Sequence, residues 1–159
     1  DDGKGTMEAL YFGTSRGWGH GQGKGPWVMA DLENGLWAGK DRVSTSNNPI
    51  DADYVTAMVK GYPGGFTLKG GDAQRGKLTR LYEGERPPHY NPMKKQGAII
   101  LGVGGDNSDW AVGTFFEGAM VAARASDATD DAVQANIVAA GYGAVPPRSD
   151  MVEVLARVS

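Results

Sequence analysis

Glycine and proline recur along this chain at spacings that leave room only for short elements. The 159 residues include 25 glycines and 8 prolines, which interrupt apolar runs about every 8 to 15 residues. Such punctuation is typical of antiparallel proteins with many strands, and the length suits one domain. We therefore predict an all-β protein, with strands over residues 7–13, 26–33, 53–61, 65–70, 77–84, 97–105 and 113–123.

One helix is predicted near the C-terminal end, over residues 128–140. Asp127 or Thr129 is expected to cap its first turn, and Gly141 is expected to end it. The buried face of this helix is predicted from the apolar residues at helical spacing, Val133, Ile137 and Ala140.

Charge and composition argue against several classes of function. Lysine and arginine number 16 against 19 aspartates and glutamates, giving a formal net charge of −3 without a basic run, so a nucleic-acid partner is not expected. No apolar stretch is long enough to span a membrane. The chain has no cysteine, and His20 and His89 are its only histidines, so neither a disulfide nor a metal site is expected.

Glycine clusters also fail to form a phosphate-binding loop. Neither "GWGHGQGKG" (17–25) nor "LGVGGDN" (101–107) has glycine at the third position required by the G-x-G-x-x-G pattern. No serine lies in the strand-to-helix elbow that serine hydrolases require, so that class of enzyme is not expected either. Carboxylates remain as the source of chemistry, and no cofactor is expected.

Two carboxylates occupy an unusual position in the predicted strand 26–33. Alternation places four side chains on one strand face, namely Trp27, Met29, Asp31 and Glu33. A surface strand usually separates charges from aromatic residues, so a face that carries both is typical of a cleft. The alternative for Asp31 is a structural acid that accepts hydrogen bonds.

A third carboxylate, Asp106, follows the predicted strand 97–105 after two glycines. That position delivers an acid to the rim of a sheet and leaves space for a ligand. Two carboxyl groups about 5 Å apart carry out retaining glycoside hydrolysis, one as nucleophile and one as acid/base. The alternative for Asp106 is a turn in which its side chain binds its own backbone.

Two more residues have alternative interpretations. Trp18 lies in the glycine-rich stretch, where its ring is suited to the apolar face of a sugar, or else anchors the loop. Glu117 follows two phenylalanines and is either a candidate acid or a solvated residue between inward-facing aromatics.

Three blocks of sequence resemble the catalytic domain of glycoside hydrolase family 54, namely "MADLENGL" (29–36), "GAIILGVGGDNS" (97–108) and "VQANIVAA" (133–140). Members of that family are retaining α-L-arabinofuranosidases that remove arabinofuranosyl side chains from arabinan and arabinoxylan. The likeness extends from about Gly3 to Tyr142. It implies a β-sandwich of the concanavalin-like or jelly-roll kind, an extracellular location, and a reaction that needs no cofactor.

The resemblance also assigns roles to individual residues. Glu33 corresponds to the nucleophile and Asp106 to the general acid/base. The residues expected to hold the arabinose are Trp18, Asp31, Asn34 and, through its backbone, Gly105. Residues 1–143 are then part of the catalytic domain, and residues 144–159 are a tail or a final strand without assignment.

Two departures from the family pattern affect this interpretation. Family members carry a pair of adjacent cysteines before the region matched here, and they also carry a C-terminal arabinose-binding module. The chain thus resembles the C-terminal half of a catalytic sandwich, whose inner face is expected to be exposed unless a missing segment, a companion chain or a second copy covers it. The alternative function is a catalytically silent β-sandwich fragment that binds carbohydrate or assembles with itself.

Overall fold

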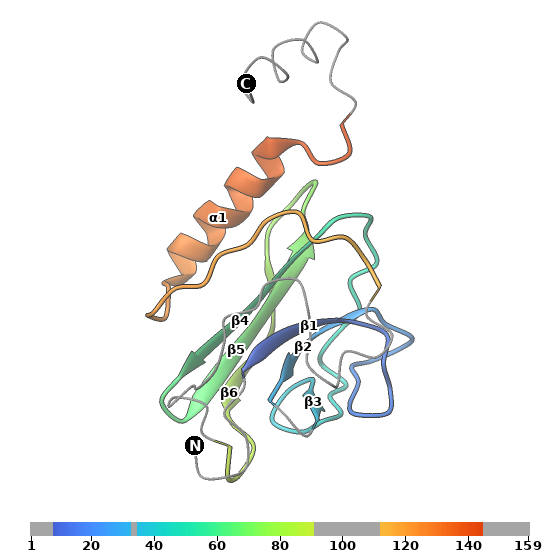
Figure 1. Cartoon of the computed structure of the whole chain (residues 1–159), viewed down its shortest axis with the longest axis vertical. Helices are drawn as coiled ribbons and strands as arrows, with labels where there is room; N and C mark the ends of the chain where they lie inside the picture. The colour runs from blue at the N-terminus through green and yellow to red at the C-terminus, as the bar shows by residue number, and fades with distance from the viewer. Residues whose placement is uncertain (1–7, 33–34, 91–111, 145–159) are drawn as a thin grey trace, which may run out of the picture.

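The computed structural model of the chain describes residues 8–32, 35–90 and 112–144. Within these ranges it contains strands and one helix, in the order β1 (Ala9–Gly13), β2 (Trp27–Asp31), β3 (Leu36–Trp37), β4 (Val55–Tyr62), β5 (Gly65–Asp72), β6 (Thr79–Glu85) and α1 (Asp127–Ala140) (Figure 1). Five of the predicted strands and the predicted helix are confirmed, and their ends differ from the predicted ones by at most two residues.

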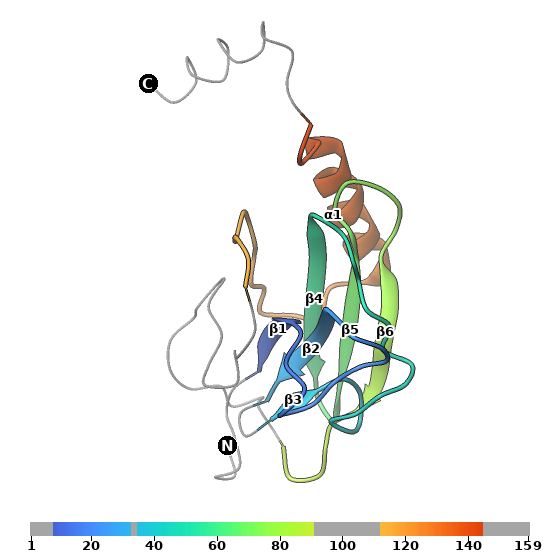
Figure 2. The same cartoon turned by 90° about the vertical axis from the view of Figure 1, so that its right-hand side faces the viewer.

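The strands form two antiparallel sheets that pack face to face. One sheet has the order β1-β2-β3 and the other β4-β5-β6, and Figure 2 shows both from the side. The core between them consists of buried apolar residues, Val28, Ala30, Leu32, Phe66, Leu68 and Leu81. The predicted all-β sandwich is therefore confirmed. Because these side chains are covered, the expectation of an exposed inner face is wrong for the described sheets.

Strand β2 is buried on both faces. Its other face carries Trp27 and Met29, which form a second cluster with Tyr11, Leu36 and Ala38. All five residues of β2 are buried, as expected for a central strand covered on each side. The strand that carries the candidate carboxylate is thus the most firmly held in its sheet.

The turn between β4 and β5 illustrates how local sequence sets the register. Tyr62 pairs with Gly65, so the loop contains only Pro63 and Gly64. Gly64 has a φ of +79°, a conformation that glycine adopts without steric cost. A proline followed by such a glycine is the preferred pair at the centre of a type II turn.

Helix α1 begins at a cap that the sequence analysis did not identify. The Ser126 hydroxyl accepts a hydrogen bond from the Thr129 backbone N–H at 3.1 Å, so the predicted caps Asp127 and Thr129 are wrong. Serine at this position satisfies a backbone donor that the first turn leaves unpaired. The predicted end is confirmed, because Gly141 follows the helix with a left-handed φ of +70°.

The face that α1 buries is polar rather than apolar. Asp130 and Gln134 are buried, whereas Val133 is 43% exposed and Ala140 is exposed, so the predicted stripe is wrong except at the half-buried Ile137. The reason lies in the sheet beneath the helix, where Lys60 and Lys69 project from the face opposite the core. A helix over two buried ammonium groups must present carboxylates to them.

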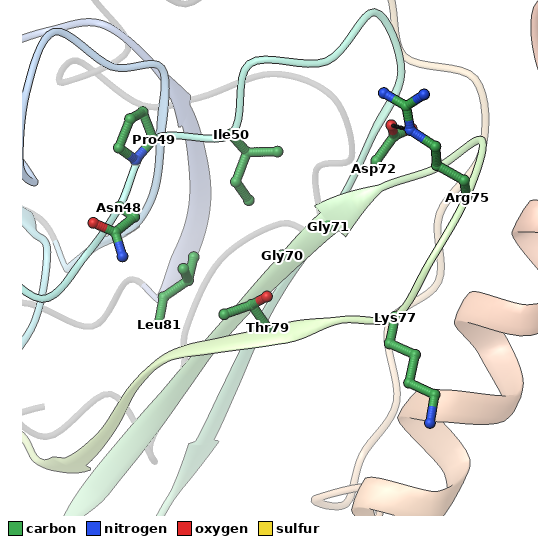
Figure 3. A pocket seen from close by; sticks show the side chains of 10 residues that line it. All are labelled: Asn48, Pro49, Ile50, Gly70, Gly71, Asp72, Arg75, Lys77, Thr79 and Leu81. Atoms are coloured by element: carbon green, nitrogen blue, oxygen red, sulfur yellow. Dashed lines mark ion pairs between the residues drawn. The ribbon is translucent and has the colours of Figure 1, made fainter.

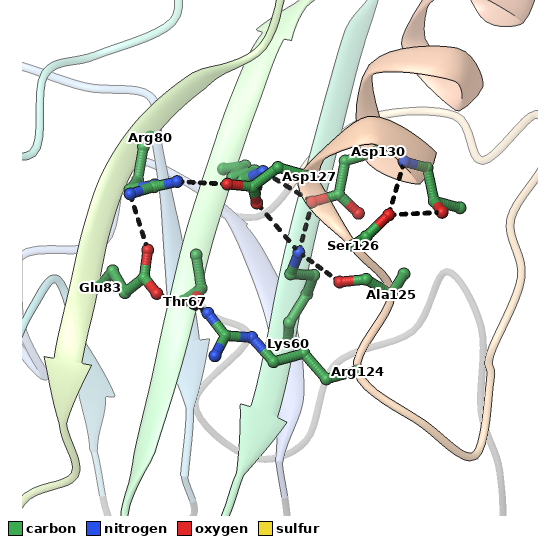
Figure 4. Close-up of polar contacts among 11 residues, drawn as sticks. Lys60, Thr67, Arg80, Glu83, Arg124, Ala125, Ser126, Asp127 and Asp130 are labelled. Carbon is green, nitrogen blue, oxygen red and sulfur yellow. Dashed lines mark hydrogen bonds and ion pairs between the residues drawn. The ribbon is translucent and has the colours of Figure 1, made fainter.

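An ionic network joins α1 to this outer sheet face (Figure 4). The Lys69 ammonium donates to Asp127 Oδ1 and to Asp130 Oδ2, both at 2.6 Å. Lys60 also binds Asp130 and donates to the Ala125 carbonyl at 3.0 Å. At the edge, the guanidinium of Arg80 reaches Asp127 Oδ2 at 2.5 Å. The helix is therefore held mainly by charge pairs.

This network makes the free energy of unfolding depend on pH in the acidic range. The hydrogen bond from Lys69, with further help from the Lys69, Arg80 and Lys60 charges, lowers the pKa of Asp127. A folded-state pKa below the unfolded value of about 3.9 contributes stability that is present above that value and lost as pH falls through the folded pKa. We expect urea unfolding to show a steeper loss of stability between pH 5 and pH 2 for the wild type than for Asp127→Asn. Parallel pH curves for the two proteins would contradict this.

One predicted strand is absent from the described part of the chain. Residues 113–123 have no strand, although their apolar residues predicted one. A strand requires a neighbour to complete its backbone hydrogen bonds, and no described strand lies in register with this segment. The predicted strand 97–105 and residues 145–159 of the unassigned tail lie outside the described residues.

Candidate active site

The candidate site is built around the end of β2. Asp31 is the last residue of this strand, is 1% exposed, and pairs with Ala9 on one side and Leu36 on the other. Just beyond it, the Leu32 backbone N–H donates to the Gly35 carbonyl at 3.4 Å. The connection from β2 to β3 is therefore short and tied at its base. Glu33 and Asn34, which lie between these two residues in the sequence, are outside the described residues.

Trp18 is brought to the same strand ends by the glycine-rich loop. The Trp18 carbonyl accepts a hydrogen bond from the Leu36 N–H at 3.3 Å, and Leu36 is the β3 partner of Asp31. The next residue, Gly19, approaches so closely that an added Cβ would lie 2.0 Å from the Leu36 carbonyl oxygen. The loop thus rests on the β3 backbone, and it leaves the Trp18 side chain 40% exposed.

A different tryptophan anchors this loop. Trp27 is fully buried, and its indole N–H donates to the Gln22 carbonyl at 2.7 Å. The Arg16 guanidinium lies 5.6 Å from the centre of the Trp27 ring and donates to the Gly23 carbonyl at 2.7 Å. Since Trp27 provides the anchor, the half-exposed Trp18 ring is available for contact with a ligand.

Sequence reasoning missed Asn47, which organises the back of the site. This buried side chain donates through Nδ2 to the carbonyls of Val28 at 2.9 Å and Ala38 at 3.0 Å. The Asn47 backbone carbonyl accepts a hydrogen bond from the Gln22 N–H at 2.8 Å. One residue thus ties β2, the segment after β3 and the glycine-rich loop together. Nothing in the local sequence indicated this, because all three contacts are distant along the chain.

The short strand β3 was also missed, although a signal for it existed. Asn34-Gly35 is a preferred pair for the tight turn of a hairpin, and it comes directly after a predicted strand. That dipeptide predicts a returning strand at Leu36, where the structure has one.

Of the other predicted residues, only Glu117 is placed by the described part of the chain, and it lies away from the end of β2. Gly105 and Asp106 lie outside the described residues. Glu117 is exposed, and its side chain accepts a hydrogen bond from the Tyr142 hydroxyl at 2.5 Å. Tyr142 lies just after the C-terminal end of α1. Among the described residues, the site therefore unites Asp31 and Trp18 only.

A separate open pocket of about 400 Å³ lies between the loop Asn48–Ile50 and strands β5 and β6 (Figure 3). Its carboxylate, Asp72, forms an ion pair with Arg75 at 2.8 Å and accepts the Gln74 N–H. Neither Trp18 nor Asp31 lines it. The pocket offers one carboxylate that is already paired, so it does not supply the two acids needed for glycoside hydrolysis.

The histidines do not contribute a metal centre within the described ranges. There, no group of three or more histidine, aspartate and glutamate side chains is arranged to hold a metal ion. The Nδ1 atom of His20 lies 2.8 Å from the Gly21 carbonyl, within the glycine-rich loop. None of the helices in the described part of the chain is both long and apolar enough to cross a membrane.

Comparison with known proteins relates this architecture to one family. Residues 1–143 match the family described as "Alpha-L-arabinofuranosidase B, catalytic". The chain is 54% identical over 149 residues to an α-L-arabinofuranosidase of Hypocrea jecorina, and equally to an arabinofuranosidase/β-xylosidase of Trichoderma koningii. These alignments cover 92% of this chain but 30% of each relative.

Solved structures give the same result. The chain superposes with a TM-score of 0.80 on a glutamate-to-glutamine mutant of a glycoside hydrolase family 54 α-L-arabinofuranosidase soaked with 4-nitrophenyl α-L-arabinofuranoside, at 48% identity. It superposes equally well on an arabinofuranosidase complexed with arabinofuranosyl-α-1,2-xylobiose. Both alignments cover 87% of this chain and 30% of the solved chain. The chain belongs to glycoside hydrolase family 54, the family of the α-L-arabinofuranosidase B catalytic domain.

Proposed function

We propose that this chain carries the catalytic centre of a retaining α-L-arabinofuranosidase. The observation that supports this most directly is the geometry at the end of β2. The buried carboxylate Asp31 pairs with Leu36 of the neighbouring strand. The Leu36 N–H in turn donates to the carbonyl of Trp18, whose ring is half exposed. Carboxylates and exposed aromatic rings are complementary to the hydroxyl groups and the apolar face of a sugar.

The proposed reaction is a double displacement by two carboxyl groups. Glu33 attacks the anomeric carbon and forms a glycosyl-enzyme, while Asp106 donates a proton to the departing oxygen. Asp106 then accepts a proton from water, which attacks the same carbon and releases arabinose with its original configuration. The sequence supports these roles because Glu33 follows Asp31 by two residues and Asp106 follows two glycines.

The remaining site residues are proposed to bind the arabinofuranosyl ring. Asp31 and Asn34 accept and donate hydrogen bonds to its hydroxyl groups, the Gly105 backbone contributes another polar contact, and Trp18 packs on its apolar face. The buried position of Asp31 favours this, because a carboxylate held by a central strand loses little conformational freedom on binding.

The proposed substrates are polysaccharides that carry terminal arabinofuranosyl residues, such as arabinan and arabinoxylan. The solved relative complexed with arabinofuranosyl-α-1,2-xylobiose supports a xylan-linked substrate. Because these polymers belong to plant cell walls, we propose that the protein acts outside the cell.

The test uses two proteins, because the chain spans 30% of the length of its relatives. One is the purified chain, and the other is a chimera in which this chain replaces the matched 149 residues of the Hypocrea jecorina relative. We expect the chimera to hydrolyse 4-nitrophenyl α-L-arabinofuranoside, with the α-anomer of arabinose appearing first by ¹H NMR. Initial release of the β-anomer would refute retention. Arabinan binding without hydrolysis by either protein would favour the silent binding module.

A further inference from the structure

Beside the candidate site, a positively charged side chain lies against Gly35, the residue before β3. An added Cβ on Gly35 would be 2.9 Å from Nε and 3.1 Å from Nη2 of Arg42, so the guanidinium occupies the space that a side chain would need. The same guanidinium lies over the Trp37 ring, with Cζ 5.3 Å from the ring centroid. Because a cation is attracted to the face of an aromatic ring, Trp37 holds the Arg42 charge at this position.

The backbone of Arg42 is fixed by the glycine-rich loop. Its carbonyl accepts a hydrogen bond from the His20 N–H at 2.9 Å, and the Ser44 N–H donates to the His20 carbonyl at 3.1 Å. This is the loop that carries Trp18 to the candidate site. Arg42 is therefore held through its backbone by that loop and through its side chain by the Trp37 ring.

The position of the guanidinium matters because of the acids that precede Gly35. Gly35 follows Glu33 by two positions, so chain connectivity keeps their Cα atoms within about 7 Å of each other. Asp31 precedes Glu33 by the same separation and is 1% exposed. A neighbouring carboxylate disfavours the ionised form of a second carboxyl group, whereas a neighbouring cation favours it. A carboxyl group that acts as a nucleophile must be ionised.

We propose that Arg42 is a positioning residue for the reaction, whose positive charge at the turn between β2 and β3 keeps Glu33 ionised despite the nearby Asp31. The inference rests on the proposed function, because it concerns the proposed nucleophile. Two other cations on the segments around this sheet are engaged elsewhere, Arg16 with the Trp27 ring and Lys40 with Glu85.

A series of charges at position 42 tests this role in the chimera. Arg42→Lys keeps the positive charge, Arg42→Met removes it and Arg42→Glu reverses it. We expect kcat for 4-nitrophenyl α-L-arabinofuranoside to fall at least about tenfold with methionine, further with glutamate, and less than about threefold with lysine. KM should change less than about threefold, because Arg42 acts on the nucleophile and not on the sugar. The control is Arg75→Met, at a side chain that is 86% exposed and paired with Asp72, and it should leave kcat unchanged.

Salt separates a charge effect from a packing effect. Arg42 is an exposed residue, so dissolved ions can screen its charge. The ratio of kcat between the wild type and Arg42→Met should therefore approach one as NaCl is raised from about 50 mM to about 1 M. A role in packing alone would leave this ratio unchanged.

The contact with Trp37 is measured without any activity, by NMR of the purified chain. The Trp37 ring should shift the Arg42 Nε–H resonance upfield of those of exposed arginines such as Arg75, and Arg42→Met identifies the resonance by its loss. An Arg42 resonance at the position of an exposed arginine would overturn the inference, whatever the kinetics show.

Three kinetic results would also overturn it. They are a wild-type kcat in Arg42→Met, equal losses with methionine and lysine, and a kcat ratio that does not respond to salt. A raised KM for arabinoxylan with an unchanged kcat would instead assign Arg42 to substrate binding, which likewise excludes the proposed role. An inactive wild-type chimera with a shifted Arg42 resonance would refute the proposed function, while the position of the charge at the turn would stand.

Discussion

Glu33→Gln is expected to lower kcat/KM of the chimera for 4-nitrophenyl α-L-arabinofuranoside by about 10⁴-fold or more. The amide cannot form the glycosyl-enzyme, so the whole double displacement is lost. Asp106→Asn is expected to cost about 10²–10⁴-fold, the usual contribution of a general acid/base. Initial rates with this chromogenic substrate measure both effects.

Azide separates the two roles from a structural effect. Added azide should accelerate the Asp106→Asn chimera and yield arabinofuranosyl azide of retained configuration, because azide attacks the glycosyl-enzyme without needing a base. With Glu33→Gln, any azide product should have inverted configuration, since azide then takes the place of the nucleophile. The control is Glu85→Gln, an exposed carboxylate paired with Lys40, which should change kcat/KM by less than about twofold. Near-normal hydrolysis by either active-site variant would contradict the assignment.

Asp130→Asn is expected to lower the free energy of unfolding by about 3 kcal/mol or more. Asp130 is 3% exposed and binds both Lys60 and Lys69, whose side chains are 9% and 6% exposed. Removing its charge leaves two buried ammonium groups for which Asp127 is the one remaining ion-pair partner among the described residues. Breaking one side of a buried ion pair costs more than losing a surface pair, because the remaining charge cannot regain its hydration.

Asp131→Asn provides the matched control for this substitution. Asp131 is the next residue on the same helix and is exposed, so its change should alter stability by no more than about 0.5 kcal/mol. Urea unfolding of the chain, followed by far-ultraviolet circular dichroism, gives both values. Equal losses for the two variants would show that the charge cluster under α1 does not stabilise the fold.

Much of the secondary structure could be predicted from short-range signals. The Pro63-Gly64 turn, the alternation in strand β2 and Gly141 after α1 each depend on a few neighbouring residues, and each is found in the structure. The segment 113–123 shows the limit of such signals. Its apolar residues suit a strand, but a strand also needs a partner, which the segment itself cannot specify.

For the candidate site, the sequence indicated individual residues but not the contacts between them. Asp31 and Trp18 were chosen as ligand-binding residues from local sequence and family resemblance, and their roles remain predictions. That Trp18 meets the partner strand of Asp31, through Leu36, could not be read from the sequence, because the contact joins segments separated by 18 positions. Asn47 escaped notice for the same reason, since a lone asparagine near a turn usually serves only the turn.

The sequence by itself determined the all-β class, the positions of most elements and the family, because alternation, turn residues and long sequence blocks are local properties of the chain. Only the tertiary structure decided that α1 buries Asp130 and Gln134 while Val133 remains exposed. The physical reason is that burial depends on what lies opposite. Two lysines on the far side of the β4-β5-β6 sheet make a carboxylate more favourable there than a methyl group, and their position relative to the helix exists only once the sheet has formed.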